Sequence, residues 1–242
     1  MPCFTKEQHE NAGELFYPIP KSFLLSSNWR NLPMRAKAIF PVIAIHANKS
    51  GECWPGKNRI AKLSGMAKDT TDKAFQDLLD AKIICINKPD GKINKKNPIE
   101  IVFDDYEDDM SGNIRFYKKI VTSGIWAVLP EKAKVVFLSL LGNMYARMEG
   151  NELSHFEVIG KASDIAVWAG ISKPTAITAI NQLCHITHNG HYLLEHEKLD
   201  KDIHKFTYSK DPPQWHWPVN KLNNNKKLKK IREMHYGEYN YH

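Results

Sequence analysis

RIAKLSGMAKDTTDKAFQDL, residues 59–78, aligns without a gap to DIAVWAGISKPTAITAINQL, residues 164–183. In each segment a short apolar helix is expected to run into a glycine, Gly65 or Gly170, with a second helix starting shortly after it. Glycine permits the left-handed backbone of a tight turn between two helices that pack at a steep angle. The two segments therefore predict two helix-turn-helix units in one chain.

A second pair of similar stretches lies upstream of these units. Residues 29–40 read WRNLPMRAKAIF and residues 126–137 read WAVLPEKAKVVF, and an aromatic pair precedes each copy at Phe16-Tyr17 and Phe116-Tyr117. The copies are offset by 97 residues here (Leu32 to Leu129) and by 105 residues in the helix-turn-helix (Ile60 to Ile165). Two matches in the same order indicate an internal duplication. The second copy carries about eight extra residues, which we expect near residues 147–157.

Apolar periodicity predicts which faces of these helices are buried. Each copy starts a helix after Leu-Pro, where proline suits the first turn because its missing N–H costs nothing there. Pro41 lies inside the first such helix and should kink it or end it early. The expected buried positions are Ala36, Ile39, Val42, Ile43, Thr71, Phe75 and Leu78 in the first copy, and Ala133, Val136, Ser139, Leu140, Ala176, Ile180 and Leu183 in the second.

After each second helix the apolar pattern shifts towards a period of two, which is typical of strands. Residues 83–86 and 99–103 flank a polar stretch at 87–98, and residues 192–195 and 205–208 flank one at 197–204. Three helices followed by a hairpin is the plan of a winged helix. We therefore predict a mainly α fold with small β-hairpin wings, built as two tandem winged helix-turn-helix domains.

The predicted organisation has five segments. They are an N-terminal extension (1–14), winged-helix domain 1 (15–104), an acidic linker (105–113), winged-helix domain 2 (114–210) and a basic, aromatic C-terminal extension (211–242).

Three motifs carry a resemblance to a known family. They are the lead-in Tyr17-Pro18-Ile19-Pro20-Lys21-Ser22-Phe23-Leu24, the stretch Gly51-Glu52-Cys53-Trp54-Pro55 and the Gly-x-x-Lys-x-Thr turn. Over residues 15–210 the chain resembles the winged helix-turn-helix proteins that initiate plasmid and phage replication, and related transcription regulators. The resemblance implies two winged helices that read an iterated origin repeat in double-stranded DNA, with host replication proteins as further partners. It also implies monomers on origin DNA and a homodimer in repression.

In a helix-turn-helix, the N-terminal half of the second helix enters the major groove. Lysine and threonine near its start suit phosphates, whereas Gln76 and Asn181 suit adenine and aspartate suits the cytosine amino group. The two sets of exposed residues differ, so we expect an asymmetric site whose halves have different sequences. The predicted DNA-binding positions are Lys68, Asp69, Thr70, Asp72, Lys73 and Gln76 in the first copy, and Lys173, Thr175, Ile177, Thr178 and Asn181 in the second.

Charged segments outside the helices add candidates for DNA contact. The first wing tip holds Lys88, Lys92, Lys95 and Lys96, which suit phosphates or a minor groove unless the hairpin is merely solvated. Residues 221–232 hold six basic and no acidic side chains, and form either a DNA-clasping arm or a solubilising tail. The five carboxylates of residues 104–109 would be repelled by phosphate, so that linker should face away from DNA.

Composition narrows the class of protein. The formal net charge of +7 is compatible with nucleic acid or an anionic membrane surface. No apolar run approaches the roughly 18 residues of a membrane-spanning helix, and the first residues lack an apolar signal core. Four scattered cysteines argue against a disulfide framework. We therefore expect a cytoplasmic, nucleoid-associated protein with no membrane partner.

No motif predicts catalysis. A complete GxxxxGK[ST] phosphate loop is absent, and the cysteine and histidines between Cys184 and His196 match no common zinc spacing. We expect no enzyme activity, no cofactor and no metal site. Two alternatives to a replication initiator stay open on the sequence. One is a transcriptional repressor with the same DNA contacts, and the other is a winged-helix scaffold that binds only protein.

Overall fold

Two halves of the chain repeat the same order of elements. The computed structural model describes residues 16–48, 50–86, 98–103, 112–149, 152–184, 187–188 and 191–209. The first half comprises β1 (Phe16–Pro20), α2 (Lys21–Leu25), α3 (Ser27–Asn31), α4 (Met34–Ala44), β2 (Glu52–Cys53), α5 (Lys57–Ser64), α6 (Lys68–Asp80), β3 (Ile84–Ile86) and β4 (Ile99–Ile101).

The second half follows the same plan with additional strands. It comprises β5 (Asn113–Tyr117), α7 (Lys118–Thr122), α8 (Ile125–Val128), α9 (Glu131–Asn143), β6 (Tyr145–Glu149), β7 (Glu152–Lys161), α10 (Ala162–Ala169), α11 (Lys173–Cys184), β8 (Thr187–His188), β9 (His191–Tyr192), β10 (Glu195–Asp200) and β11 (Ile203–Ser209). The strand and two short helices that open each half were not predicted. The result is a mixed α and β architecture.

The hairpins that follow α6 and α11 pair with an earlier strand of their own half. The first sheet has the order β2-β4-β3, and the second has the order β10-β11-β7-β6. The extra residues of the second copy form the β6–β7 hairpin, close to where the repeat offset predicted them. The loop predicted at 197–204 is wrong, because β10 and β11 pair as far as Asp200 and Ile203. Tyr192 belongs to β9, not to this hairpin.

Both helix-turn-helix glycines adopt the predicted left-handed backbone. Gly65 has φ 68° and Gly170 has φ 66°, and each ends the first helix of its unit. The amide of Met66 donates to the carbonyl of Ala61, and that of Ile171 donates to Ala166, in the pattern that satisfies the last carbonyls of a helix. All the residues predicted to be buried on α4, α6, α9 and α11 are buried.

Of the two effects predicted for Pro41, a kink or an early end of the helix, the early end is wrong. Helix α4 continues to Ala44, and the carbonyl of Pro41 accepts a hydrogen bond from the amide of Ile45. Every residue from Ala36 to Ala44 is buried, so packing on all sides offsets the backbone hydrogen bond that proline removes.

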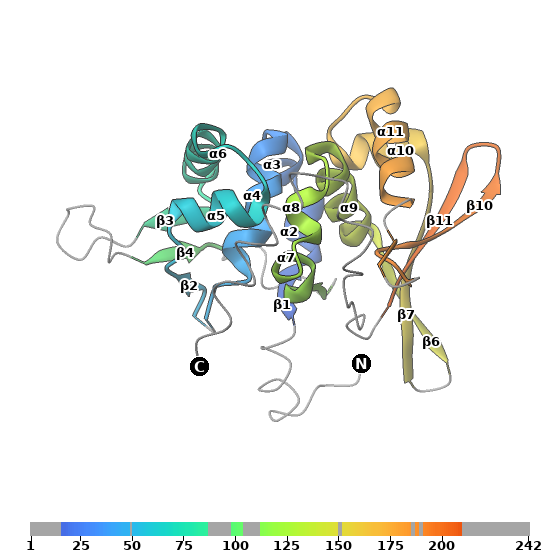
Figure 1. The fold of residues 1–242 in the computed structure, drawn as a ribbon. Coiled ribbons are helices and arrows are strands. Elements are labelled where there is room, and N and C mark those ends of the chain that lie inside the picture. The colour runs from blue at the N-terminus through green and yellow to red at the C-terminus, as the bar shows by residue number, and fades with distance from the viewer. Residues whose placement is uncertain are drawn as a thin grey trace.

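Helices α4 and α9 occupy the centre of the molecule. They pack against each other, and one continuous apolar core extends through both halves. In Figure 1, α5, α6 and the β3–β4 hairpin lie on one side of this centre, and α10, α11 and the β10–β11 hairpin lie on the other. Figure 1 also shows α6 and α11 at the same upper edge of the molecule.

A local twofold relation links the two halves. Strands β1 and β5 pair antiparallel, with Phe16 opposite Tyr117 and Tyr17 opposite Phe116. Phe16-Tyr17 and Phe116-Tyr117 occupy the same place in the two repeats. The phenylalanine of each repeat therefore pairs with the tyrosine of the other. That exchange is what a twofold axis between the strands produces.

Two buried lysines repeat the exchange deeper in the core. Lys37 of α4 is 1% exposed, and its Nζ donates to the carbonyl of Ala169 at 2.9 Å, where α10 ends. Lys134 of α9 is 2% exposed, and its Nζ donates to the carbonyl of Ser64 at 2.6 Å, where α5 ends. Each ammonium thus caps the negative end of the first helix of the helix-turn-helix in the other half. We call these two contacts the crossed lysine caps.

The turn glycines are pressed against the opposite half as well. A Cβ added to Gly65 would lie 1.9 Å from the carbonyl oxygen of Ala127, and one added to Gly170 would lie 2.6 Å from that of Arg30. Ala127 and Arg30 are counterparts in the repeat alignment. Both helix-turn-helix units are therefore fixed in orientation by backbone contacts and by the crossed lysine caps.

We predict that Gly65→Ala destabilises the protein by more than about 2 kcal/mol. A left-handed φ costs a residue with a Cβ roughly 1–2 kcal/mol, and the clash with the Ala127 carbonyl adds to it. Denaturant unfolding of the purified protein measures the difference. Gly56→Ala is the matched control, because its Cβ would meet nothing within 4 Å, and we expect a change below about 1 kcal/mol. Equal effects of the two substitutions would contradict the close approach of the halves.

Lys37 predicts an unusual pH dependence of stability. Burial, and then the charge of Arg30, lower the pKa of Lys37 to about 8 from its ordinary value of 10.5. Between these values the unfolded chain binds the proton that the folded chain has lost, so the free energy of unfolding rises with pH. The gain is on the order of 3 kcal/mol across the window.

The measurement is denaturant unfolding of the wild type and of Lys37→Met at pH 7.5, 9 and 10.5. The difference in unfolding free energy between them should grow in favour of the wild type as pH rises. A difference that shrinks over this range would mean that the fold stabilises the charged ammonium.

Candidate nucleic-acid interface

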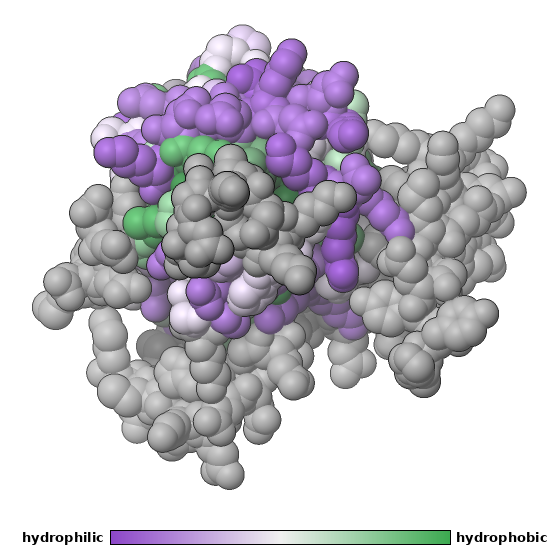
Figure 2. All heavy atoms as spheres, turned by 90° about the vertical axis from the view of Figure 1, so that its left-hand side faces the viewer, coloured by the Kyte–Doolittle hydropathy of each residue, from purple (hydrophilic) through white to green (hydrophobic). Residues whose placement is uncertain are grey.

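Helix α6 presents a polar stripe opposite its buried face. Asp69, Asp72, Lys73 and Gln76 recur at the spacing of one helix face, and all four are exposed or half-buried. The opposite face buries Thr71, Ala74, Phe75 and Leu78 in the core. Figure 2 shows a mainly hydrophilic surface across the top of this side of the molecule. We call Asp69, Asp72, Lys73 and Gln76 the α6 stripe.

Ion pairs hold α6 in place and define which of its charges face outward. Arg35 of α4 makes a two-pronged contact with Asp77, with Nε 2.6 Å and Nη2 3.0 Å from the carboxylate oxygens. Asp72 lies 2.9 Å from Nζ of Lys57, which partly neutralises it. Lys68 and Lys73 are exposed near the N-terminal half of the helix, where a helix-turn-helix contacts DNA.

Helix α11 presents a different stripe at the equivalent positions. Pro174, Ile177, Thr178 and Asn181 are all exposed, opposite the buried Ala176, Ala179, Ile180 and Leu183. We call these four exposed residues the α11 stripe. After Lys173 the helix contains no charged residue. The two stripes therefore differ in chemistry while the faces beneath them both pack into the core.

Hydroxyl groups on α11 are bonded within the helix. Thr178 Oγ1 donates to the carbonyl of Pro174 at 2.9 Å. Thr175 Oγ1 and Ser172 Oγ lie 2.8 Å apart, and Ser172 Oγ accepts from the Thr175 amide at 3.4 Å. Ser172 thus caps the first turn of α11.

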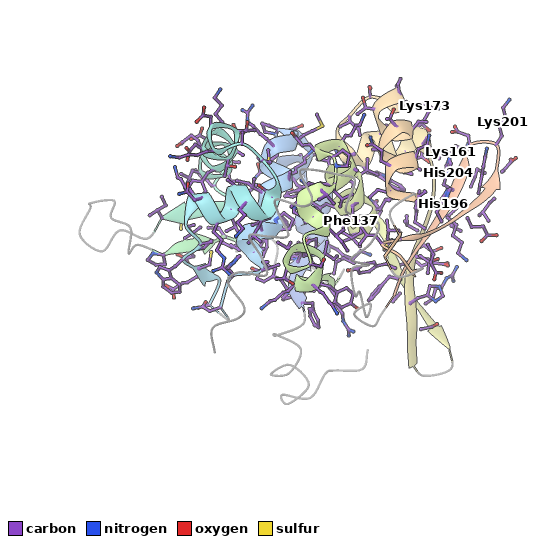
Figure 3. The ribbon with its side chains drawn as sticks, in the orientation of Figure 1. Phe137, Lys161, Lys173, His196, Lys201 and His204 are labelled. Carbon is purple, nitrogen blue, oxygen red and sulfur yellow. The ribbon has the colours of Figure 1, made fainter. Side chains whose placement is uncertain are left out.

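The β10–β11 hairpin is tied to the start of α11. Lys173 Nζ lies 3.0 Å from Asp202, at the tip of the hairpin, and this contact lowers the pKa of the Asp202 carboxyl. Figure 3 shows Lys161, Lys173, His196 and His204 on the side where the hairpin and helices α10 and α11 meet, with Lys201 at the tip. Of these residues, the sequence predicted only Lys173 as part of the site. The others join it because the pairing of β10 with β11 brings the hairpin tip to the start of α11, which local sequence does not reveal.

Two stacked histidines lie on the same hairpin. His196 Nε2 and His204 Nδ1 are 2.9 Å apart, and the ring centroids are 5.1 Å apart. Burial lowers the pKa of both imidazoles. Their pairing follows from the register of β10 and β11, which place them diagonally across the hairpin.

A buried carboxylate gathers cations on the outer face of the second sheet. Glu157 on β7 accepts from Arg147 on β6 and lies 3.2 Å from Nζ of Lys205 on β11. Burial alone would raise the pKa of Glu157, but hydrogen bonds from Arg147, Tyr145 and Lys205 lower it to about 2. Sequence reasoning missed this cluster, because it joins the β6–β7 hairpin to β11, a strand distant in sequence.

The helix residues that the sequence singled out form two separate sets, one on each side of the central helices. The six on α6 and the five on α11 are exposed or half-buried, and Figure 1 shows both helices at the upper edge of the molecule. Lys88, Lys92, Lys95 and Lys96, most of the acidic linker and the basic C-terminal segment lie outside the described residues. Within the described part of the chain, no helix is long and apolar enough to cross a membrane, and no three histidine, cysteine or acidic side chains group as metal ligands.

Comparison with known proteins places the first half in a structural class. A family model described as a helix-turn-helix domain matches residues 30–84, from the end of α3 to the start of β3. Neither the curated proteins nor the solved structures contain a match to the chain. The first half therefore contains a helix-turn-helix domain, the class of domain that most often binds DNA through its second helix.

Proposed function

We propose that the protein is a sequence-specific, double-stranded-DNA-binding protein that uses two winged helices. In this proposal α6 and α11 are the recognition helices, and the β3–β4 and β10–β11 hairpins are the wings. The helix-turn-helix match at residues 30–84 supports the first reading helix. The repeated order of elements extends the proposal to the second half.

The observation that carries the proposal is the fixed, twofold-related placement of α6 and α11. The crossed lysine caps and the two turn glycines hold both helix-turn-helix units in one orientation. Twofold-related recognition helices read half-sites in inverted orientation, about 34 Å apart on one face of the duplex. Since both helices belong to one chain, the second contact is intramolecular, and two weak contacts together bind tightly.

The differing stripes make the proposed target an imperfect inverted repeat of roughly 20 base pairs. The α6 stripe offers carboxylates, an ammonium and an amide, whereas the α11 stripe offers aliphatic groups and an amide. A perfectly symmetric sequence would satisfy only one of the two helices.

We further propose that the protein initiates replication of a plasmid or phage-like element. The lead-in strand and the paired winged-helix plan support this role through their resemblance to such initiators. In that role it binds repeated origin sites and recruits host replication proteins, without enzymatic activity or a cofactor of its own. Repression of transcription would use the same DNA contacts, so the arrangement of binding sites must discriminate between the two roles.

Selection from random duplexes tests the DNA-binding proposal. We expect one enriched bipartite motif with unequal, inverted halves and a log–log salt slope steeper than about −5, because six or more phosphates are neutralised. Several copies of the motif at a replication origin would support initiation, and a single copy within a promoter would support repression. Salt-insensitive binding with no enriched motif would refute DNA reading and favour a protein-binding scaffold.

Replacing Lys73 by glutamine should weaken DNA binding and lower the salt slope by about 1, since Lys73 is exposed in the N-terminal half of α6, which the proposal places against the DNA. Titration of a labelled duplex at several salt concentrations measures both quantities. Lys82→Gln removes the same charge beyond the C-terminal end of α6 and should leave the slope nearly unchanged. If both substitutions act equally, α6 does not enter the groove by its N-terminal half.

A further inference from the structure

We propose that α11 selects its half-site through the 5-methyl groups of thymine, using Ile177 and the methyl group of Thr178. This inference rests on the proposed DNA-binding function and names the bases that one half of the site must contain. Thymine is distinguished from other bases in the major groove by this methyl group, which apolar side chains contact.

The position of Ile177 carries the argument. The repeat alignment and the twofold relation place Ile177 where α6 has Asp72, and Thr178 where α6 has Lys73. In the proposed complex, the α11 stripe therefore faces its half-site as the α6 stripe faces the other. A duplex read by both helices would meet a charged pair in one half and two aliphatic groups in the other.

Exposure shows that Ile177 is available for such a contact. Its side chain is 41% exposed, although the helix buries four other residues in the core. Contact with an apolar group of a ligand would remove this aliphatic surface from water, which is favourable. A row of thymine methyl groups is the apolar surface that a major groove offers.

The hydrogen bonding of Thr178 points the same way. Its hydroxyl hydrogen already bonds the carbonyl of Pro174, so the side chain offers a base its methyl group and an acceptor oxygen but no donor. Pro174, one turn earlier, adds further apolar surface to the stripe. Only Asn181 brings a side-chain amide to it, and an amide suits adenine, the partner of thymine. The α11 stripe as a whole therefore suits A·T pairs.

Replacing single thymines by deoxyuridine in the selected duplex tests the proposal, because the change removes the methyl group and leaves base pairing intact. Each contacted methyl lost from the α11 half should weaken binding about fourfold, the factor expected for one buried methylene-sized group. The same change in the α6 half should alter affinity less than about twofold, since the α6 stripe is polar. Selection from random duplexes is repeated with the Asn181→Ala variant. The half of the motif in which base preference relaxes is the half that α11 reads.

Ile177→Ala provides the decisive variant. It should abolish the difference between thymine and deoxyuridine in the α11 half, and its thermal unfolding should match the wild type because the side chain is exposed. Val167→Ala is the matched control, since Val167 is a 60% exposed aliphatic residue on α10, in the same half but off the stripe. The control should retain full thymine preference.

The results of these binding measurements test methyl reading separately from the proposed DNA-binding function. A duplex that binds tightly but tolerates deoxyuridine throughout overturns methyl reading and leaves the DNA-binding proposal standing. Thymine preference that survives in Ile177→Ala also overturns it. Failure of any duplex to bind overturns both proposals together.

Discussion

The crossed lysine caps are the contacts on which the arrangement of the two halves depends. An ammonium group buried in an apolar core is costly unless polar partners satisfy it. Lys37 and Lys134 each find such a partner at the carboxyl end of a helix in the opposite half, where the last carbonyls need donors. Lys37 Nζ also donates to the carbonyl of Arg30 in its own half, so this ammonium joins the two halves. Leaving a buried ammonium and a buried carbonyl without partners would be costly, and this cost favours one relative orientation of the helix-turn-helix units.

Packing between the halves also explains why the two central helices are buried on nearly all sides, whereas an ordinary amphipathic helix keeps one polar face in water. Helices α4 and α9 face each other across the twofold axis and are covered on their other sides by the helix-turn-helix units, so almost no surface is left for water. The turn glycines complete the arrangement, because the backbone of the opposite half occupies the space that a Cβ would need. A duplicated sequence has thus become one packed unit in which each repeat supplies part of the other's framework.

Against this shared framework, the outward surfaces have diverged. Equivalent core positions on α6 and α11 keep apolar or small residues, while the stripes above them hold Asp72 and Lys73 in one half and Ile177 and Thr178 in the other. Under the proposed function, a rigid scaffold with two unlike surfaces suits an asymmetric target. A change in the core would then move both surfaces at once, whereas a change on one stripe would alter the reading of one half-site alone.

The sequence by itself determined the repeat, the helix-turn-helix units, the buried faces of their helices and the hairpin after each second helix. These follow from local periodicity and from glycine at a left-handed turn, which act within a few residues. Tertiary structure alone decided that Lys37 and Lys134 are buried, that β1 pairs with β5, and that α4 continues through Pro41. It also decided that the tip of the second hairpin reaches Lys173. Those features depend on partners some 30 to 130 residues away, and local pattern carries no information about which distant carbonyl or strand will complete a buried group.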